Sequence, residues 1–382
     1  MLKSHGHNTS KASYLCDVIA VALGLGAVAF VGCAADPATE DGAGGAAAST
    51  AGDGGDGSQA TGSGAAGSGG GATTTTGTNG TGDTTGAGGG TGLPDPNLDG
   101  EYAYDTLDAS VTVDATGDTF DVHAFIPSAG PSSGPYPLVV IAHGFQLPTS
   151  EYTLYAERLA SFGYVAVLPD YPTSLFSPSH VDNALDLSGV VDWAETAAAL
   201  AGKVDTSLTG MTGHSLGGKV SLLAAKNDPR VKAVIALDPV DSATSCNATD
   251  CPDMSSQMGS LTIPTGFLGE TTDASGGFQP CAPAADNFTT FYANAPSPSF
   301  MVTVLGANHM SFLDDVAGCG FTCSFCQPST ANDAEVNAMA RAYVTAFFER
   351  HLRGIAGYDA YLTGSEAEAR YVTPGKATIE SK

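Results

Sequence analysis

The sequence has few basic residues: 14 of its 382 residues are Lys or Arg, against 40 Asp or Glu, and the formal net charge is −26. Proteins that bind nucleic acids or anionic lipid surfaces use clustered Lys and Arg to neutralise phosphates. The shortage of basic residues therefore argues against both classes of partner. Charged residues of either sign make up only 14% of the chain, whereas glycine is frequent, at 49 residues.

A long apolar run is also lacking. The most apolar segment near the N-terminus, Val18–Gly32, is shorter than a membrane-spanning helix requires. Two lysines and no acidic residue precede Asp17, so we expect residues 1–32 to be an export signal. The signal ends in Val-Gly-Cys33, which resembles the bacterial lipobox. We therefore expect Cys33 to be lipidated and to become the first residue of the mature protein, with ordinary secretion as the alternative. Ala34 after the cysteine favours sorting to the outer membrane or the cell surface.

Residues 33–95 consist mainly of Gly, Ser, Thr and Ala tracts without a periodic apolar stripe. Such tracts behave as flexible coil, because they cannot bury enough apolar surface to fold. A glycine-rich phosphate-binding loop is disfavoured, since no strand pattern precedes it and no Gly-Lys-Ser/Thr follows. We expect a disordered tether here and a single folded domain over residues 96–382, which is long enough for one large core.

The folded part alternates between strand and helix patterns. A period-two hairpin around Gly117 predicts an antiparallel sheet edge, and continuously apolar runs predict strands buried on both faces. The expected strands are Ser110–Val113, Phe120–Ile126, Pro137–Ala142, Tyr164–Pro169, Leu208–Gly213, Val231–Leu237, Ile263–Gly269 and Phe300–Leu305. The expected helices are Glu151–Phe162, Val181–Leu200, Leu216–Lys226 and a closing helix over 331–352. This alternation predicts an α/β fold with a mostly parallel central sheet and helices on both faces.

The strongest chemical signal is Gly-His-Ser215-Leu-Gly-Gly, which fits G-x-S-x-G between an expected strand and an expected helix. A sharp turn there would expose the Ser215 hydroxyl as a nucleophile, and Gly213 and Gly217 would leave room for the turn. The amide of Leu216, at the start of the helix, would face a developing oxyanion. The amide of Phe145, in the His-Gly-Phe segment that follows the expected strand Pro137–Ala142, is the expected second donor.

A nucleophilic serine needs a base and an acid that orients it. Of the eight histidines, His309 lies in a loop after the last expected strand and C-terminal to Ser215, so it is the expected base. Asp238 ends the strand that follows the nucleophile helix and is the first candidate acid, because ligands bind at the carboxyl ends of parallel strands. Glu270 and Asp273 follow the next strand and are rivals for this role.

Several segments resemble one branch of the α/β-hydrolase superfamily, which holds chlorophyllases and platelet-activating-factor acetylhydrolases, with cutinase-like polyester hydrolases as more distant relatives. The resemblance covers roughly residues 100–355 and is carried by YPLVVIAHGF, EYTLYAERLASFGYVAVLPDYP, GHSLGGK, IALDPVD and VLGANHMSFLDD. It implies an α/β-hydrolase fold with Asp238, rather than Glu270 or Asp273, as the acid and His309 as the base. Plant chlorophyllases carry Arg after the nucleophile, where this chain has Leu216, so the resemblance implies ester hydrolysis more strongly than chlorophyll specificity.

Six cysteines follow the tether: Cys246, Cys251, Cys281, Cys319, Cys323 and Cys326. An even number in an exported protein predicts three disulfides, among 15 possible pairings. Cys246 and Cys251 are spaced to close a small loop, and we expect Cys281 to pair with one of the last three. A metal cluster built from those three is the alternative, but it lacks an obvious fourth ligand.

Two functions from different classes compete. The first is a surface-tethered serine carboxylesterase of apolar esters, either chlorophyllase-like, lipid or polyester, and the second is a cell-surface binding protein that keeps the fold without turnover. All three triad candidates are present, which favours the esterase. We expect no cofactor, no metal and no nucleic-acid partner, a membrane contact through the N-terminal lipid, and a monomer.

Overall fold

The computed structural model describes residues 18–21, 28–31, 92–241, 246–275, 280–317 and 325–382. The chain divides into two units, Met1–Gly70 and Gly71–Lys382. In the first unit, the apolar run that we interpret as an export signal contains β1 (Val18–Val21) and β2 (Val28–Val31), which pair antiparallel. Cys33 and most of the expected tether lie outside the described residues.

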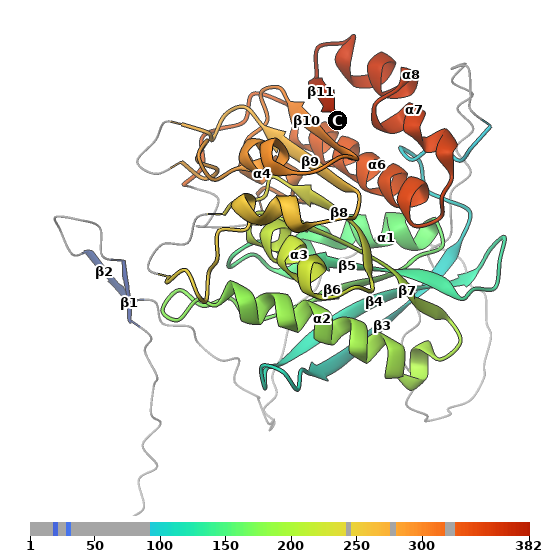
Figure 1. Cartoon of the computed structure of the whole chain (residues 1–382), viewed down its shortest axis with the longest axis horizontal. Helices are drawn as coiled ribbons and strands as arrows, with labels where there is room; N and C mark the ends of the chain where they lie inside the picture. Colours follow the sequence, from blue (N-terminus) through green and yellow to red (C-terminus); the bar gives the residue numbers. More distant parts are fainter. Residues whose placement is uncertain (1–17, 22–27, 32–91, 242–245, 276–279, 318–324) are drawn as a thin grey trace, which may run out of the picture. The chain divides into compact units, whose positions relative to one another are not determined.

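The second unit is built around a sheet whose nine described strands follow the order β11-β10-β9-β8-β7-β5-β6-β4-β3 (Figure 1). The strands β5 to β10 run parallel to one another, whereas β3, β4 and β11 are antiparallel to their neighbours. Their bounds are β3 Ala103–Thr112, β4 Thr119–Ala129, β5 Tyr136–Ala142, β6 Val165–Pro169, β7 Val204–His214, β8 Val231–Leu237, β9 Thr265–Glu270, β10 Ser299–Val304 and β11 Ala377–Ser381. The sheet confirms the predicted α/β fold.

Helices cover both faces of this sheet, and each face has its own apolar core. The helices α1 (Thr153–Ser161) and α6 (Asp333–His351) contribute to one core, and α2 (His180–Thr196), α3 (Leu216–Asn227) and α4 (Phe288–Asn294) contribute to the other. The remaining described helical elements are η1 Thr149–Tyr152, η2 Ala198–Leu200, η3 Ser255–Ser260, η4 His309–Phe312, η5 Ala356–Tyr358, α7 Asp359–Leu362, α8 Ser365–Ala367 and η6 Glu368–Val372. No described helix has both the length and the apolar character needed to cross a bilayer.

The expected strands and helices are all present; Val231–Leu237 has its expected bounds, and the others have shifted ends. Every residue of β5 is buried, as expected for a strand covered on both faces, and the hairpin of β3 and β4 turns at Gly117, whose φ is 80°. The expectation that the helix over 331–352 closes the domain is wrong. The chain continues through α7, α8 and η6 and returns to add the edge strand β11 beside β10.

Candidate active site

Ser215 sits in a sharp turn between a strand and a helix. The strand β7 ends at His214 and α3 begins at Leu216, so Ser215 is the single residue between them. Its backbone has φ 56° and ψ −121°, which is a strained conformation for a residue with a side chain. The turn also brings Gly217 against the end of β5, where an added Cβ would clash with the carbonyl oxygen of Ala142. The glycines of the motif therefore have the steric role that the sequence predicts.

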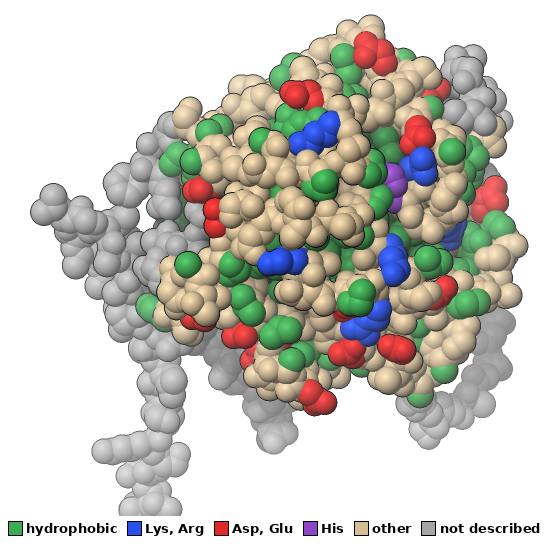
Figure 2. Space-filling view, viewed as in Figure 1, with side chains coloured by type: hydrophobic (Ala, Val, Ile, Leu, Met, Phe, Trp, Pro, Cys, Tyr) green, Lys and Arg blue, Asp and Glu red, His purple; other side chains and the backbone are tan. Residues whose placement is uncertain are grey.

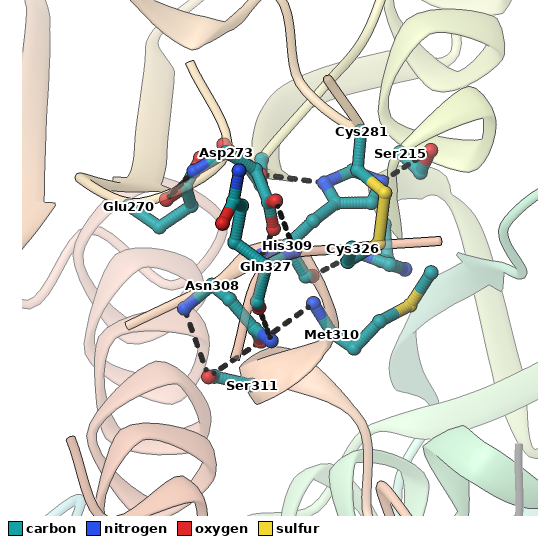
Figure 3. Close-up of a disulfide and its surroundings, with 12 residues drawn as sticks. Ser215, Glu270, Asp273, Cys281, Asn308, His309, Met310, Ser311, Cys326 and Gln327 are labelled. Atoms are coloured by element: carbon teal, nitrogen blue, oxygen red, sulfur yellow. Dashed lines mark hydrogen bonds and ion pairs between the residues drawn. A yellow bond between two sulfur atoms is a disulfide. The ribbon is translucent and has the colours of Figure 1, made fainter. Parts of the chain in front are cut away.

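A line of hydrogen bonds joins the three residues that the sequence singles out. His309 Nε2 lies 2.9 Å from Ser215 Oγ, and His309 Nδ1 lies 2.6 Å from Asp238 Oδ2. His309 and Asp238 are buried, and Figure 3 shows the imidazole aimed at Ser215. Because a carboxylate accepts hydrogen bonds, the ring proton is assigned to Nδ1, which leaves the Nε2 lone pair facing the serine hydroxyl. This arrangement allows His309 to take a proton from Ser215.

Burial and hydrogen bonding act in opposite directions on the acid of this line. Asp238 directly follows β8, has φ 42° and is fully buried. Burial raises the pKa of its carboxyl group, and the hydrogen bond and charge of His309 oppose that rise. An imidazolium at His309 would therefore favour the charged carboxylate, which is the form that stabilises the protonated base.

The two rival acids hold the backbone around His309. Asp273 Oδ2 accepts a hydrogen bond from the His309 amide at 2.9 Å, and its Oδ1 accepts one from the Gln327 amide at 2.7 Å (Figure 3). Glu270 Oε2 accepts from the amides of Thr272 and Asp273. Burial, followed by the charge of Asp238, raises the pKa of Glu270 to about 7. The carboxylate in contact with the imidazole is thus that of Asp238.

The two expected oxyanion donors belong to segments beside Ser215. Leu216 is the first residue of α3, and the first amides of a helix have no partner within the helix. Phe145 lies in the loop after β5, between Gly144 and Gln146. The Gly144 amide donates to the hydroxyl of Tyr152 at 3.0 Å, and Gln146 Nε2 donates to the carbonyl oxygen of Thr173 at 2.7 Å. These bonds hold the loop in place on both sides of Phe145.

Comparison with known proteins identifies the family of this chain. A family model described as Chlorophyllase matches residues 99–366. The chain belongs to the chlorophyllase family. It is 27% identical to Chlorophyllase-2 of Arabidopsis thaliana over 243 residues, which are 58% of this chain and 75% of that protein. It is also 31% identical to bis(hydroxyethyl) terephthalate hydrolase of Streptomyces coelicolor over 166 residues, covering 44% and 47%, and 26% identical to Cutinase est1 of Thermobifida alba over 164 residues, covering 42% and 49%. Chlorophyllase family membership indicates a carboxylic ester hydrolase.

Two disulfides lie in the described part of this chlorophyllase-family chain. Cys246 pairs with Cys251 and closes a small loop, as expected, and Cys281 pairs with Cys326. The second bridge adjoins the candidate site, because Gln327 is the next residue and donates its amide to Asp273. Cys326 is therefore not available as a thiolate for the alternative metal cluster. Asp273, Cys281 and Cys326 also lie close together, but both cysteines are in the disulfide and cannot bind a metal as thiolates. Cys319 and Cys323 lie outside the described residues.

An exposed apolar surface lies on a loop bonded to the candidate oxyanion loop. Leu175 and Phe176, between β6 and α2, are 51% and 82% exposed. Thr173, in the same loop, is hydrogen-bonded to Gln146, the neighbour of the partly buried Phe145. We call Phe145, Leu175 and Phe176 the apolar rim. Leu175 and Phe176 could not be predicted as surface residues of the site, because a Leu-Phe pair in a loop has no periodicity to mark it.

Two cavities open elsewhere, at the antiparallel edge of the sheet. One, of about 270 Å³, is lined by residues of β3, β4 and the η1 region, including His123 and Asp108. The other, of about 560 Å³, is lined by the end of β4, the segment that follows it and single residues of β3 and β5 and Lys203. Ser215, His309 and Asp238 line neither of them. The candidate site is therefore assigned to the hydrogen-bonded serine, histidine and aspartate and to neither cavity, because these side chains can carry out a reaction.

Proposed function

We propose that this chlorophyllase-family chain is a serine carboxylesterase of apolar esters, with Ser215 as nucleophile, His309 as base and Asp238 as the acid that orients the base. The observation that carries the proposal is the unbroken line from Ser215 Oγ through both ring nitrogens of His309 to Asp238 Oδ2, at 2.9 and 2.6 Å. The strained backbone of Ser215 supports it, because such strain persists where a turn must present a reactive group.

In the proposed reaction, Ser215 Oγ attacks the ester carbonyl carbon while His309 Nε2 takes the hydroxyl proton. The amides of Phe145 and Leu216 stabilise the negative charge on the carbonyl oxygen. The intermediate collapses, the C–O bond to the alcohol breaks, and His309 returns the proton to the departing alcohol. Water then attacks the acyl-enzyme with the same base, releasing the carboxylic acid and free Ser215.

An apolar substrate fits the surface beside the candidate oxyanion loop. The apolar rim offers two exposed side chains beside the oxyanion loop. On the face drawn in Figure 2, Lys and Arg side chains are scattered rather than gathered, in line with their low number in the sequence. The relatives are named for chlorophyll, terephthalate ester and cutin hydrolysis. A polyester hydrolase is the second candidate function, because the relative named for a terephthalate ester is 31% identical to this chain.

We also propose that the enzyme is exported and attached through a lipidated Cys33. Disulfides form and persist in oxidising compartments, and the described residues contain two. A flexible segment of about 60 residues would span about 40 to 45 Å on average, which would allow the enzyme to reach esters away from its anchor.

A fluorophosphonate probe and a series of p-nitrophenyl esters of increasing acyl length test the esterase. The wild type should be labelled and should hydrolyse the esters, and Ser215→Ala should lose labelling and about 10⁴-fold to 10⁶-fold of its turnover. Ser207→Ala is the matched control, because Ser207 is an exposed serine on the same strand. A Ser215→Ala enzyme within about tenfold of wild type would refute the nucleophile, and a folded wild type with neither labelling nor turnover would favour the binding protein.

A further inference from the structure

A buried chain of hydrogen bonds connects the candidate oxyanion loop to the loop that carries the candidate base. The Gly144 amide lies 3.0 Å from Tyr152 Oη, which lies 3.0 Å from His214 Nδ1, and His214 Nε2 lies 2.8 Å from the carbonyl oxygen of His309. Tyr152 and His214 are fully buried. These residues come from three separate elements: Tyr152 ends η1, His214 ends β7, and His309 begins η4.

The donor and acceptor groups fix the direction of each hydrogen bond in this series. Burial, reinforced by the neighbouring His309, holds the pKa of His214 well below its usual range, so its imidazole is neutral. A neutral imidazole has one N–H donor and one acceptor nitrogen. Since Nε2 faces a carbonyl oxygen, the proton is on Nε2, and Nδ1 accepts from the hydroxyl of Tyr152. The Tyr152 oxygen in turn accepts from the Gly144 amide. In this series of hydrogen bonds, each N–H or O–H donor therefore faces an acceptor.

We propose that Tyr152 and His214 are positioning residues, which hold the Gly144–Phe145 segment and the His309 backbone in fixed relation across Ser215. The proposal rests on the proposed esterase function, and neither residue touches the reacting atoms. Gly144 precedes Phe145, the expected oxyanion donor, and His309 is the expected base. The distance between the Phe145 amide and His309 thus depends on two side chains that are neither nucleophile, base nor acid.

A packing role alone would not require these polar atoms. Burying a hydroxyl or an imidazole costs free energy unless each polar atom is paired, so apolar side chains of similar size would fill the space with less risk. The rings of His214 and His309 also lie close together, with centroids 4.6 Å apart. A neutral His214 beside His309 avoids placing a second positive charge against the imidazolium that forms during turnover.

Two steady-state constants and a control variant test the proposal. Tyr152→Phe removes only the hydroxyl, so we expect kcat for p-nitrophenyl butyrate to fall about tenfold with KM within about twofold. This loss is smaller than the roughly 10² to 10³ that removal of a direct oxyanion donor costs. Tyr164→Phe is the control, because Tyr164 is as buried as Tyr152 and its hydroxyl donates to Glu349 at 2.9 Å, away from the site. It should lower the melting temperature while leaving kcat and KM within about twofold of wild type.

The histidine is tested by graded replacement. His214→Gln can still present an N–H near the position of Nε2 to the His309 carbonyl, so it should turn over faster than His214→Phe, which can present none. Equal kcat values for folded Tyr152→Phe and wild type, with only a lower melting temperature, would overturn the positioning role. Equal kcat values for the Gln and Phe variants would do the same.

A measurement on the wild type needs no variant to fold. Nitrogen NMR of labelled histidine, with each ring assigned to its residue, should show the His214 ring as a neutral Nε2–H tautomer that does not titrate from about pH 5 to about pH 9. The assignment is needed because burial also lowers the pKa of His143, His180 and His351. Absence of such a ring would overturn the proposed direction of the chain. A wild type without esterase activity would instead refute the proposed function, so the two failures are distinguishable.

Discussion

Replacing Asp238 by Asn should stop the proposed chemistry while leaving the shape of the site unchanged. Asp238 is fully buried and its Oδ2 lies 2.6 Å from His309 Nδ1. If the Asn amide nitrogen faces Nδ1, the ring proton must move to Nε2, where it points at Ser215 and leaves no base. If the Asn oxygen faces Nδ1, the amide nitrogen takes the place of Oδ1, which has no hydrogen-bond partner among the described residues. The imidazolium then also lacks a carboxylate.

Either outcome predicts a loss of about 10⁴-fold in kcat/KM for p-nitrophenyl butyrate, or about 5 kcal/mol of transition-state stabilisation. The assay is steady-state hydrolysis at neutral pH, with the melting temperature measured to show that the variant is folded. Since Asn and Asp have the same shape, a fold that survives is the expected result.

The two neighbouring acids are the controls. Asp273→Asn keeps one oxygen for two amide donors, those of His309 and Gln327, so we expect a loss of about tenfold through misplacement of the base. Glu270→Gln keeps an oxygen that can accept the hydrogen bonds from the Thr272 and Asp273 amides, so its loss of activity should be smaller. An Asp238→Asn enzyme within about tenfold of wild type, together with a crippled Asp273→Asn or Glu270→Gln enzyme, would refute the assignment of the acid.

Three further outcomes are expected. Because burial raises the pKa of Glu270 from 4.5 to about 7, the folded protein loses stability through this group as pH rises across that interval. Glu270→Gln should therefore raise the melting temperature more at about pH 8 than at about pH 5, and equal gains would contradict the reasoning. Leu175→Ser and Phe176→Ser should slow hydrolysis of long-chain esters more than short-chain ones, whereas Leu98→Ser, at another exposed leucine, should change neither rate. Cys33→Ala should move the protein from the membrane fraction to the soluble fraction in its native host, and unchanged fractionation would count against lipidation.

Elements with a strong and uninterrupted pattern were predictable from the sequence. The strand Val231–Leu237 has the bounds that its apolar run predicts, and β5 differs from its prediction by one residue. The short helix α4 and the edge strand β11 were missed. In β11, four of five residues are not buried, so the alternation that marks a half-buried strand is absent. Its pairing with β10 depends on where the preceding helices return the chain, and no local pattern in the sequence records that.

The parts of the candidate site differ in the same way. The turn at Ser215 is local, so a six-residue motif between a strand and a helix was enough to predict it. Sequence order and a family resemblance brought forward His309 and Asp238, which the structure brings together with Ser215. Tyr152 lies in a segment that carries the family resemblance, but its role was missed, because it lies 62 residues from His214 and no chemical motif joins the two. The partner of Cys281 was also open, since any of three later cysteines fitted the spacing.

The candidate base is held on three of its polar groups by three different side chains. Asp238 accepts from its ring, Asp273 from its amide, and His214 donates to its carbonyl oxygen. Only His309 Nε2 is left for chemistry, and it faces Ser215. Groups fixed in this way need no reorganisation when charge develops, which is the main source of electrostatic catalysis. The same bonds leave little freedom to adapt this side of the site to new esters. Substrate preference should therefore vary through Leu175 and Phe176 of the apolar rim, whose loop contacts the oxyanion segment through Gln146 and contributes no atom to the line of proton transfer.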